Sequence, residues 1–254
     1  MKKSIAVKDI LIGEGSPKIC VPIIGENLDQ IIDEAVQIKT LGPDLAEWRV
    51  DFFQDVEDID KVAKALKKIH EILTPIPIIF TFRSAKEGGE KEVSLEYYTE
   101  LNKAMIETGL ADIVDVELFC GEEIVTEVVR FAHTYNVFVI ISNHDFEKTP
   151  SKEEIVKRLR KAQELGGDLP KIAVMPATSN DVLTLLDATI TMHDQYADRP
   201  IITMSMAGKG VVSRLSGEIF GSSITFGAAK KASAPGQIAV SELRQILNLL
   251  HLNM

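Results

Sequence analysis

Short apolar runs alternate along this chain with longer stretches in which apolar residues recur every three or four positions. The short runs are apolar on both faces and too brief for helices, which predicts buried parallel strands. The longer stretches have helical spacing, and Asn27 stands where an N-terminal helix cap is expected. We predict strands near residues 19–23, 45–50, 76–82, 113–118, 138–144, 169–176, 201–206 and 223–226. We predict helices near residues 28–41, 59–69, 95–107, 123–135, 152–165, 181–196, 212–220 and 240–250.

This strand–helix rhythm favours one architecture. Eight strands that are each followed by a helix are typical of a closed (β/α)8 or TIM barrel, and we expect residues 1–254 to form a single α/β domain of that kind. An open, doubly wound sheet is the alternative. Ahead of the first barrel strand, residues 5–7 and 10–12 are predicted to form a small β-hairpin.

The composition limits the partners and the compartment. The 254 residues are 45% hydrophobic, enough for a substantial core, and the formal net charge is −10. An acidic chain without a basic stripe argues against nucleic acid and anionic membrane surfaces as partners. We find neither a run of membrane-spanning length nor a signal-peptide core. The two cysteines, Cys20 and Cys120, are expected to be buried free thiols, which favours a cytoplasmic protein.

One lysine stands at the head of a predicted buried strand. Lys171 opens the run Lys171–Met175, which prolines bound on both sides. If its side chain points into a barrel, burial among apolar neighbours favours the neutral amine, the nucleophile of Schiff-base chemistry on a ketone. The alternative is a solvated lysine at a strand start.

A histidine ends the preceding strand. The apolar run at residues 138–141 leads into Ser142, Asn143 and His144, a pattern typical of the carboxyl end of a barrel strand, where barrel enzymes place their chemistry. Consecutive strands of this kind are usually neighbours, so His144 and Lys171 are expected to face one substrate. A structural histidine is the alternative.

Two earlier strand ends are also charged. Glu47 and Arg49 alternate onto one face, and in a barrel interior they would form a mutually neutralising pair. Arg83 ends the next strand, and Glu87 follows in a loop that Gly88 and Gly89 would allow to move. A carboxylate in reach of His144 would raise its basicity and fix its tautomer. Structural ion pairs and a solvated loop are the alternatives.

The last strand ends add an arginine and apolar walls. Arg214 is suited to gripping a carboxylate with two parallel hydrogen bonds, and Met204 and Met206 are expected to supply polarisable walls near the lysine. Core methionines are the alternative. The segment after Phe226, which includes Ser233 and Gln237, is long and polar and suggests a lid or an anion-holding loop.

Several standard motifs are missing. The sequence has no P-loop, no G-x-G-x-x-G after a strand, no nucleophile elbow and no zinc-type spacing of its five histidines. The sequence therefore indicates no nucleotide cofactor and no metal.

Five blocks together resemble the type I 3-dehydroquinate dehydratase family. They are Glu47–Asp51, Thr81–Gly89, Ser142–Phe146, Pro170–Pro176 and Ser233–Gln237, and the likeness extends from the hairpin to the last helix. Each block alone is weak evidence, but all of them in this order are highly specific. One departure is visible, because Pro22 stands at the end of the first strand where bacterial relatives place a serine contact.

The resemblance implies a TIM barrel, a homodimer and a place in the shikimate pathway of aromatic amino acid biosynthesis, with the hairpin capping the bottom of the barrel. It implies a lyase that needs no metal and no cofactor. The implied catalytic residues are Lys171 as Schiff-base lysine, His144 for proton transfer and Glu87 as its carboxylate partner. The implied substrate-binding residues are Glu47, Arg49, Arg83, Arg214, Ser233 and Gln237, beside the walls Met204, Met206 and Phe226.

The resulting hypothesis is the dehydration of 3-dehydroquinate to 3-dehydroshikimate. Quinate breakdown would use the same reaction. An aldolase-type barrel lyase that forms a Schiff base is the rival enzyme, although no phosphate loop is seen. A non-catalytic binding barrel is the rival outside enzymes.

Overall fold

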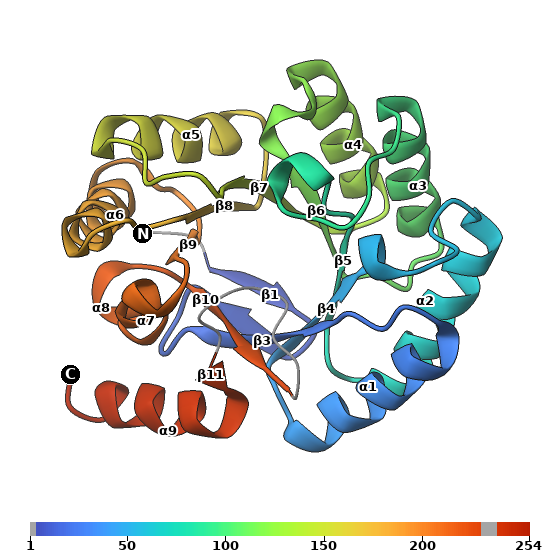
Figure 1. Cartoon of the computed structure of the whole chain (residues 1–254), viewed down its shortest axis with the longest axis horizontal. Coiled ribbons are helices and arrows are strands. Elements are labelled where there is room, and N and C mark those ends of the chain that lie inside the picture. The colour runs from blue at the N-terminus through green and yellow to red at the C-terminus, as the bar shows by residue number, and fades with distance from the viewer. Residues whose placement is uncertain (1–3, 230–237) are drawn as a thin grey trace.

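The computed structural model describes residues 4–229 and 238–254, and its core is a curled parallel sheet inside a ring of helices (Figure 1). Nine strands pair in the order β11-β10-β3-β4-β5-β6-β7-β8-β9, and each pair is parallel. Their bounds are β3 Lys18–Ile23, β4 Leu45–Arg49, β5 Ile78–Thr81, β6 Ile113–Glu117, β7 Phe138–Asp145, β8 Leu169–Val174, β9 Ile202–Ser205, β10 Ile224–Ala228 and β11 Ile238–Ala239.

The sheet curls round until its two sides meet. Strands β9 and β10 come together at a parallel bridge between Ile201 and Ser222, and the Ser223 N–H donates to the Ile201 carbonyl at 2.8 Å. Strands β3 to β10 thus form the predicted (β/α)8 barrel, and the open doubly wound sheet is excluded.

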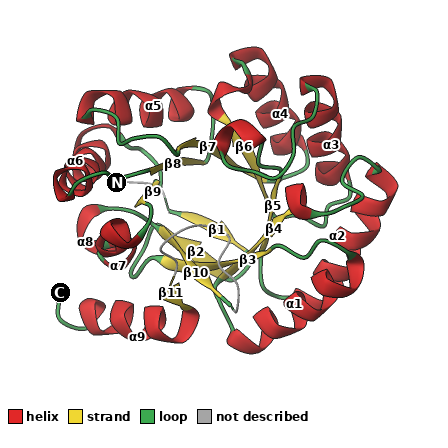
Figure 2. Cartoon of the chain, viewed as in Figure 1, coloured by secondary structure: helices red, strands yellow, loops and turns green. Residues whose placement is uncertain are grey.

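Helices cover the outside of the barrel on all sides (Figure 2). Apolar faces of these helices pack on outward-facing strand residues such as Trp48, Phe80 and Val116, which are fully buried. The helices are α1 Leu28–Leu41, α2 Ile59–Leu73, α3 Leu95–Glu107, α4 Glu122–Thr134, α5 Lys152–Glu164, α6 Ser179–Thr191, α7 Val211–Leu215, α8 Gly217–Phe220 and α9 Val240–His251.

The predicted helix boundaries are largely confirmed, with two differences. The predicted helix over residues 212–220 is split at Ser216, whose hydroxyl donates to the Val212 carbonyl and so competes with the helical hydrogen bonds. The helix predicted to reach residue 196 ends at Thr191 and continues as a π-helical turn over Met192–Tyr196.

The predicted hairpin is present and closes the amino end of the barrel. Strands β1 (Ile5–Val7) and β2 (Ile10–Ile12) pair antiparallel, and the buried Val7 and Ile12 side chains pack on the first inward-facing residue of several barrel strands. Lys8 also forms an ion pair with Asp112, just before β6, at 2.9 Å. This inner apolar layer contains Cys20, Leu45, Ile79, Ile113, Ile140, Leu169, Ile202 and Ile224.

Candidate active site

Above that apolar layer, charged residues replace apolar ones at the carboxyl ends of the strands. They surround a cavity of about 780 Å³ that includes its open mouth. Every predicted site residue that the structure describes lines this cavity, whereas Ser233 and Gln237 lie outside the described residues. The lining consists of Glu47, Arg49, Arg83, Glu87, Gly88, His144, Phe146, Lys171, Ala173, Met204, Met206, Arg214 and Phe226.

Lys171 points into the barrel, as predicted, but its surroundings are ionic. Its side chain is only 4% exposed, and its Nζ lies 3.0 Å from Asp115 Oδ2 and 3.6 Å from Glu47 Oε1. The Phe226 ring centroid lies 4.7 Å from the same nitrogen. The expected apolar neighbours are therefore only part of its surroundings, because two carboxylates compensate a buried cation that would be costly alone.

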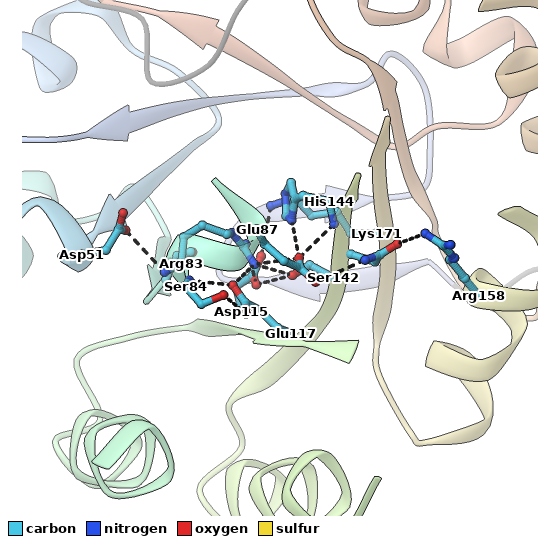
Figure 3. Close-up of polar contacts among 12 residues, drawn as sticks. Asp51, Arg83, Ser84, Glu87, Asp115, Glu117, Ser142, His144, Arg158 and Lys171 are labelled. Atoms are coloured by element: carbon cyan, nitrogen blue, oxygen red, sulfur yellow. Dashed lines mark hydrogen bonds and ion pairs between the residues drawn. The ribbon is translucent and has the colours of Figure 1, made fainter. Parts of the chain in front are cut away.

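Arg83 connects the lysine to a wider buried network (Figure 3). Its guanidinium donates to Asp115 Oδ1 at 2.8 Å, to Glu117 Oε1 at 2.9 Å and to Ser142 Oγ at 2.9 Å. Burial by itself would raise the pKa of Asp115, but the charges of Arg83 and Lys171 lower it to about 2. Asp115 is consequently ionised at neutral pH and bridges the lysine and the arginine.

His144 and Glu87 form the predicted pair. Glu87 Oε2 lies 3.0 Å from His144 Nδ1 and accepts the backbone N–H of the same residue at 2.9 Å. Burial raises the pKa of Glu87 to about 8, against the opposing charge of Arg83. Burial and the nearby cations Arg83, Lys171 and Arg49 lower the pKa of His144 well below its usual value.

These shifts give the pair two useful states. An ionised Glu87 accepts a hydrogen bond from the Nδ1–H group of His144. Nε2 then carries no proton, and its lone pair makes His144 a base. A protonated Glu87 donates to Nδ1, and Nε2 then carries the proton. The carboxylate therefore selects the tautomer, as predicted, but the predicted rise in the basicity of His144 is wrong because burial outweighs it.

The predicted pair between Glu47 and Arg49 is wrong. Arg49 instead makes a two-pronged contact with Asp51, at 2.8 and 2.7 Å, and Glu47 accepts from the Thr81 hydroxyl at 3.0 Å. Asp51 comes two residues after Arg49, and the 3-10 turn over Val50–Phe52 brings it back towards the guanidinium. Glu47 is thereby left to face Lys171.

Arg214 reaches the cavity from the short helix α7. Its side chain is buried, and its Nη1 lies 3.7 Å from Met204 Sδ. Burial lowers the pKa of Arg214 to about 10, so the guanidinium remains charged at neutral pH. Met204, Met206 and Phe226 supply the apolar part of the wall, as predicted.

Gly88 serves close packing, and the mobility expected for its loop stays a prediction. Its φ of +82° is in the left-handed region, and a Cβ at this position would lie 2.4 Å from the Phe146 ring. The Gly88 N–H donates to the Ala85 carbonyl, which closes the 3-10 turn Ala85–Glu87. The turn holds Glu87 against His144.

Sequence reasoning missed several buried polar residues of the site. Asp115 and Glu117 lie on β6, a strand that we predicted without assigning it any chemistry, and Ser142 lies beside His144. A signal was present, because Asp115 and Glu117 alternate along an apolar strand just as Glu47 and Arg49 do. Pro22 lies in β3 opposite Glu47 and is not among the lining residues.

The described residues contain neither a cluster of metal ligands nor a helix that could span a membrane. Residues 4–229 and 238–254 contain no group of three or more His, Cys, Asp or Glu side chains arranged to hold a metal ion. None of the helices described above is both long and apolar enough to cross a membrane. Cys20 and Cys120 are free thiols, as predicted, and Cys20 is fully buried whereas Cys120 is half-buried.

The fold and the site together define a parallel (β/α)8 barrel whose buried lysine shares a cavity with a histidine–carboxylate pair, a site suited to covalent chemistry on a carbonyl compound. A family model described as type I 3-dehydroquinase matches residues 19–254. The chain belongs to this family.

Individual relatives agree over the whole chain. The 3-dehydroquinate dehydratase of Bacillus licheniformis is 64% identical over 254 residues, which cover all of both chains. That of Clostridioides difficile is 62% identical over 251 residues, or 99% of this chain and 98% of the relative.

Solved structures show the same fold. A type I 3-dehydroquinate dehydratase from Clostridium difficile, crystallised with covalently modified comenic acid, superposes with a TM-score of 0.98 at 61% identity over all of both chains. The 3-dehydroquinate dehydratase of Geobacillus kaustophilus superposes with a TM-score of 0.96 at 38% identity, over 99% of each chain.

Proposed function

We propose that this protein dehydrates 3-dehydroquinate to 3-dehydroshikimate through a Schiff base on Lys171, with His144 as the proton-transfer residue and Glu87 as its partner. The observation that carries the proposal is the position of the Lys171 amine in the same buried cavity as the Glu87–His144 pair. Membership of the type I 3-dehydroquinase family supports the substrate.

The first half of the reaction forms the iminium. The Lys171 amine, once it has lost its ammonium proton, attacks the substrate ketone, and the resulting carbinolamine expels water to leave a C=N⁺ bond. Asp115 and Glu47 lie beside the nitrogen and stabilise the positive charge that persists on it. The iminium withdraws electrons and acidifies the neighbouring C–H bond.

The second half eliminates water. Nε2 of His144 takes the acidified proton, and the electron pair of that C–H bond forms a C=C bond as the β-hydroxyl departs with a proton from the imidazolium. Each acid–base step contributes roughly 10²–10⁴-fold to the rate. A second water then hydrolyses the iminium, which releases the conjugated enone and the free lysine. Proton, hydroxyl and electron pair balance without a metal or an organic cofactor.

Substrate orientation falls to the other lining residues. We propose that Arg214 binds the substrate carboxylate, because a charged, buried guanidinium at an apolar wall offers two parallel donors to an anion. Glu47, Arg49 and Arg83 would contact ring hydroxyls. Ser233 and Gln237, which lie outside the described residues, are also proposed to bind the substrate. Met204, Met206 and Phe226 would pack on the ring carbons.

The same proposal extends to the cellular setting. We infer a cytoplasmic homodimer that acts in the shikimate pathway, supported by the family and by the dehydratase names of its relatives. The covalently modified comenic acid in the structure of the Clostridium difficile relative supports the proposal of covalent chemistry. Light scattering of the purified protein tests the dimer.

Borohydride trapping tests the mechanism. The protein is incubated with 3-dehydroquinate, reduced, digested and analysed by mass spectrometry. We expect a reduced adduct on the peptide that contains Lys171, and none in Lys171→Ala, which also loses turnover. Lys209→Ala is the matched control, because its exposed amine donates to the Ala177 carbonyl away from the cavity lining. Full activity in Lys171→Ala would refute the covalent route.

A further inference from the structure

We propose that Asn143 and Arg158 are positioning residues that hold Glu87 as an acceptor and so keep His144 in its base tautomer. Neither side chain lines the cavity. Asn143 points outward from β7, and Arg158 lies on α5, the helix that follows this strand. The inference rests on the proposed role of His144 as the proton-transfer residue.

The two residues and Glu87 form one chain of hydrogen bonds. Arg158 Nη1 donates to Asn143 Oδ1 at 2.9 Å, and Asn143 Nδ2 donates to Glu87 Oε1 at 3.2 Å. The other carboxylate oxygen, Oε2, faces His144. Figure 3 labels Arg158 at one end of this chain and Glu87 and His144 at the other.

The direction of this chain follows from hydrogen-bond chemistry. A guanidinium has only donors, so the Asn143 atom that faces Arg158 must be the carbonyl oxygen. The amide nitrogen then has to face Glu87, and an NH₂ group can only donate. Oε1 is therefore an acceptor for as long as Arg158 holds the amide in this orientation. Without Arg158, the amide could flip and offer its oxygen to a protonated Glu87.

Arg158 itself is fixed on several sides. Its Nε donates to Glu154 Oε1 at 2.9 Å, one helical turn earlier, and its Nη1 lies 3.5 Å from Asp145 Oδ2. The guanidinium also lies over the Phe119 ring, 5.5 Å from the centroid. These contacts come from α5, from β7 and from the segment after β6. They hold the Arg158 guanidinium in one position, and the guanidinium in turn fixes the orientation of the Asn143 amide.

The charges around Glu87 explain why such a device matters. Arg83, after β5, lies 3.7 Å from Glu87 and favours the carboxylate, whereas burial and the charge of Glu117, at the end of β6, favour the protonated form. On the β7 side, the His144 N–H and the Asn143 amide favour the carboxylate. Arg49 and Lys171 act on His144 across the cavity. Because burial dominates and raises the pKa of Glu87 to about 8, both protonation states are populated near that pH, and one donor shifts the population.

Activity and its pH dependence test the inference together. Wild-type turnover is measured first, because its absence would refute the proposed function and not the inference. In Asn143→Ala we expect kcat to fall about tenfold with KM little changed, since a hydrogen bond to a charged group is lost. We also expect the acid limb of the kcat profile to move up by about one pH unit. Asn143→Asp should lose more, because it places a like charge beside Glu87.

A double-mutant cycle isolates the role of Arg158. If Arg158 acts through Asn143, Arg158→Met lowers kcat by about threefold and adds nothing further in the Asn143→Ala background. Arg158→Lys should recover part of the loss because it keeps a donor. Arg160→Met is the matched control, since this α5 arginine lies over Tyr196 and should leave kcat unchanged.

Two outcomes would overturn the inference in an active wild-type enzyme. One is an Asn143→Ala protein that is folded by circular dichroism and keeps the wild-type kcat and pH profile. The other is additive loss in the double mutant, which would show that Arg158 acts independently of the amide. A purely structural role would lower the melting temperature and leave the acid limb in place.

Discussion

At the scale of single residues, Glu87 Oε2 contacts two nitrogens of one partner, the backbone N–H and the ring Nδ1 of His144. Because both nitrogens belong to the same residue, these contacts fix the orientation of the imidazole ring as well as its distance from the carboxylate. The backbone contact depends on β7 alone, so it persists when the ring changes its protonation state. The Glu87 carboxylate therefore stays in place while the tautomer of His144 changes.

The pH dependence of catalysis follows from this pair. Since burial raises the pKa of Glu87 to about 8, the ionised carboxylate with a free Nε2 accumulates as the pH rises through that value. We expect kcat/KM to fall about tenfold per pH unit on the acid side of 8. Initial rates of enone formation across the pH range measure it. An acid limb centred near the ordinary glutamate pKa would contradict the assignment.

Arg214 carries a prediction about binding. Arg214→Ala should raise KM for the anionic substrate by about one to two powers of ten, because a two-pronged charged contact is lost, while kcat falls less. Arg130→Ala on the exposed face of α4 serves as the control for removing one positive charge. An unchanged KM would move the carboxylate site to another residue.

The sequence predicted residue identities in the site better than their partners. Lys171, His144, Glu87 and Arg214 line the cavity as expected. The pairing of Arg49 with Asp51 depends on how the chain turns after β4 ends, whereas Asp115 in β6 and Lys171 in β8 meet across the barrel. Periodicity gives the face on which a residue lies, but it says nothing about such turns.

At the scale of elements, the strand ends and the short turns after them shape the site. All eight barrel strands were predictable, because a buried parallel strand is an apolar run of limited length. The 3-10 turns that follow β4, β5 and β6 were not, because three residues leave no periodic pattern. Asp51 and Glu87 both lie in such turns.

Gly88 tests the turn after β5. Gly88→Ala should destabilise the protein by about 1–3 kcal/mol and also lower kcat, because the new Cβ meets Phe146 and displaces the neighbouring Glu87. Gly109→Ala is a matched control with a φ of +65° and no atom within 4 Å of the new Cβ, so it isolates the backbone strain. Urea unfolding and kcat are compared. Equal losses in both variants would exclude a packing role for Phe146.

At the scale of the whole molecule, an acidic chain accommodates an anionic ligand by local compensation. The formal net charge is −10, yet Arg49, Arg83, Lys171 and Arg214 all reach one cavity. Buried carboxylates balance most of these cations in the free protein. The overall electrostatic field of the protein therefore does not attract the anionic substrate to this site, and the composition alone could not predict the site.

The single-domain organisation of residues 1–254 stays a prediction, which one cooperative unfolding transition would support.

The hairpin contributes to the stability of the barrel. Ile12 is fully buried in the inner layer, whereas Leu11 beside it is 38% exposed. We expect Ile12→Ala to lower the free energy of unfolding by about 2–5 kcal/mol and Leu11→Ala to lower it far less, with kcat unchanged in both. Chemical denaturation measures the difference. Similar values for the two variants would show that the cap is loosely packed.

The closed amino end of the barrel also affects how substrate enters and product leaves. Val7 and Ile12 fill the floor of the barrel, so among the described residues the cavity opens to substrate and product at the carboxyl ends of the strands, above Lys171. A product molecule that stays in the cavity prevents the next substrate molecule from binding. At high turnover, the rate then depends on how quickly product leaves the cavity. We expect accumulated product to inhibit the enzyme competitively.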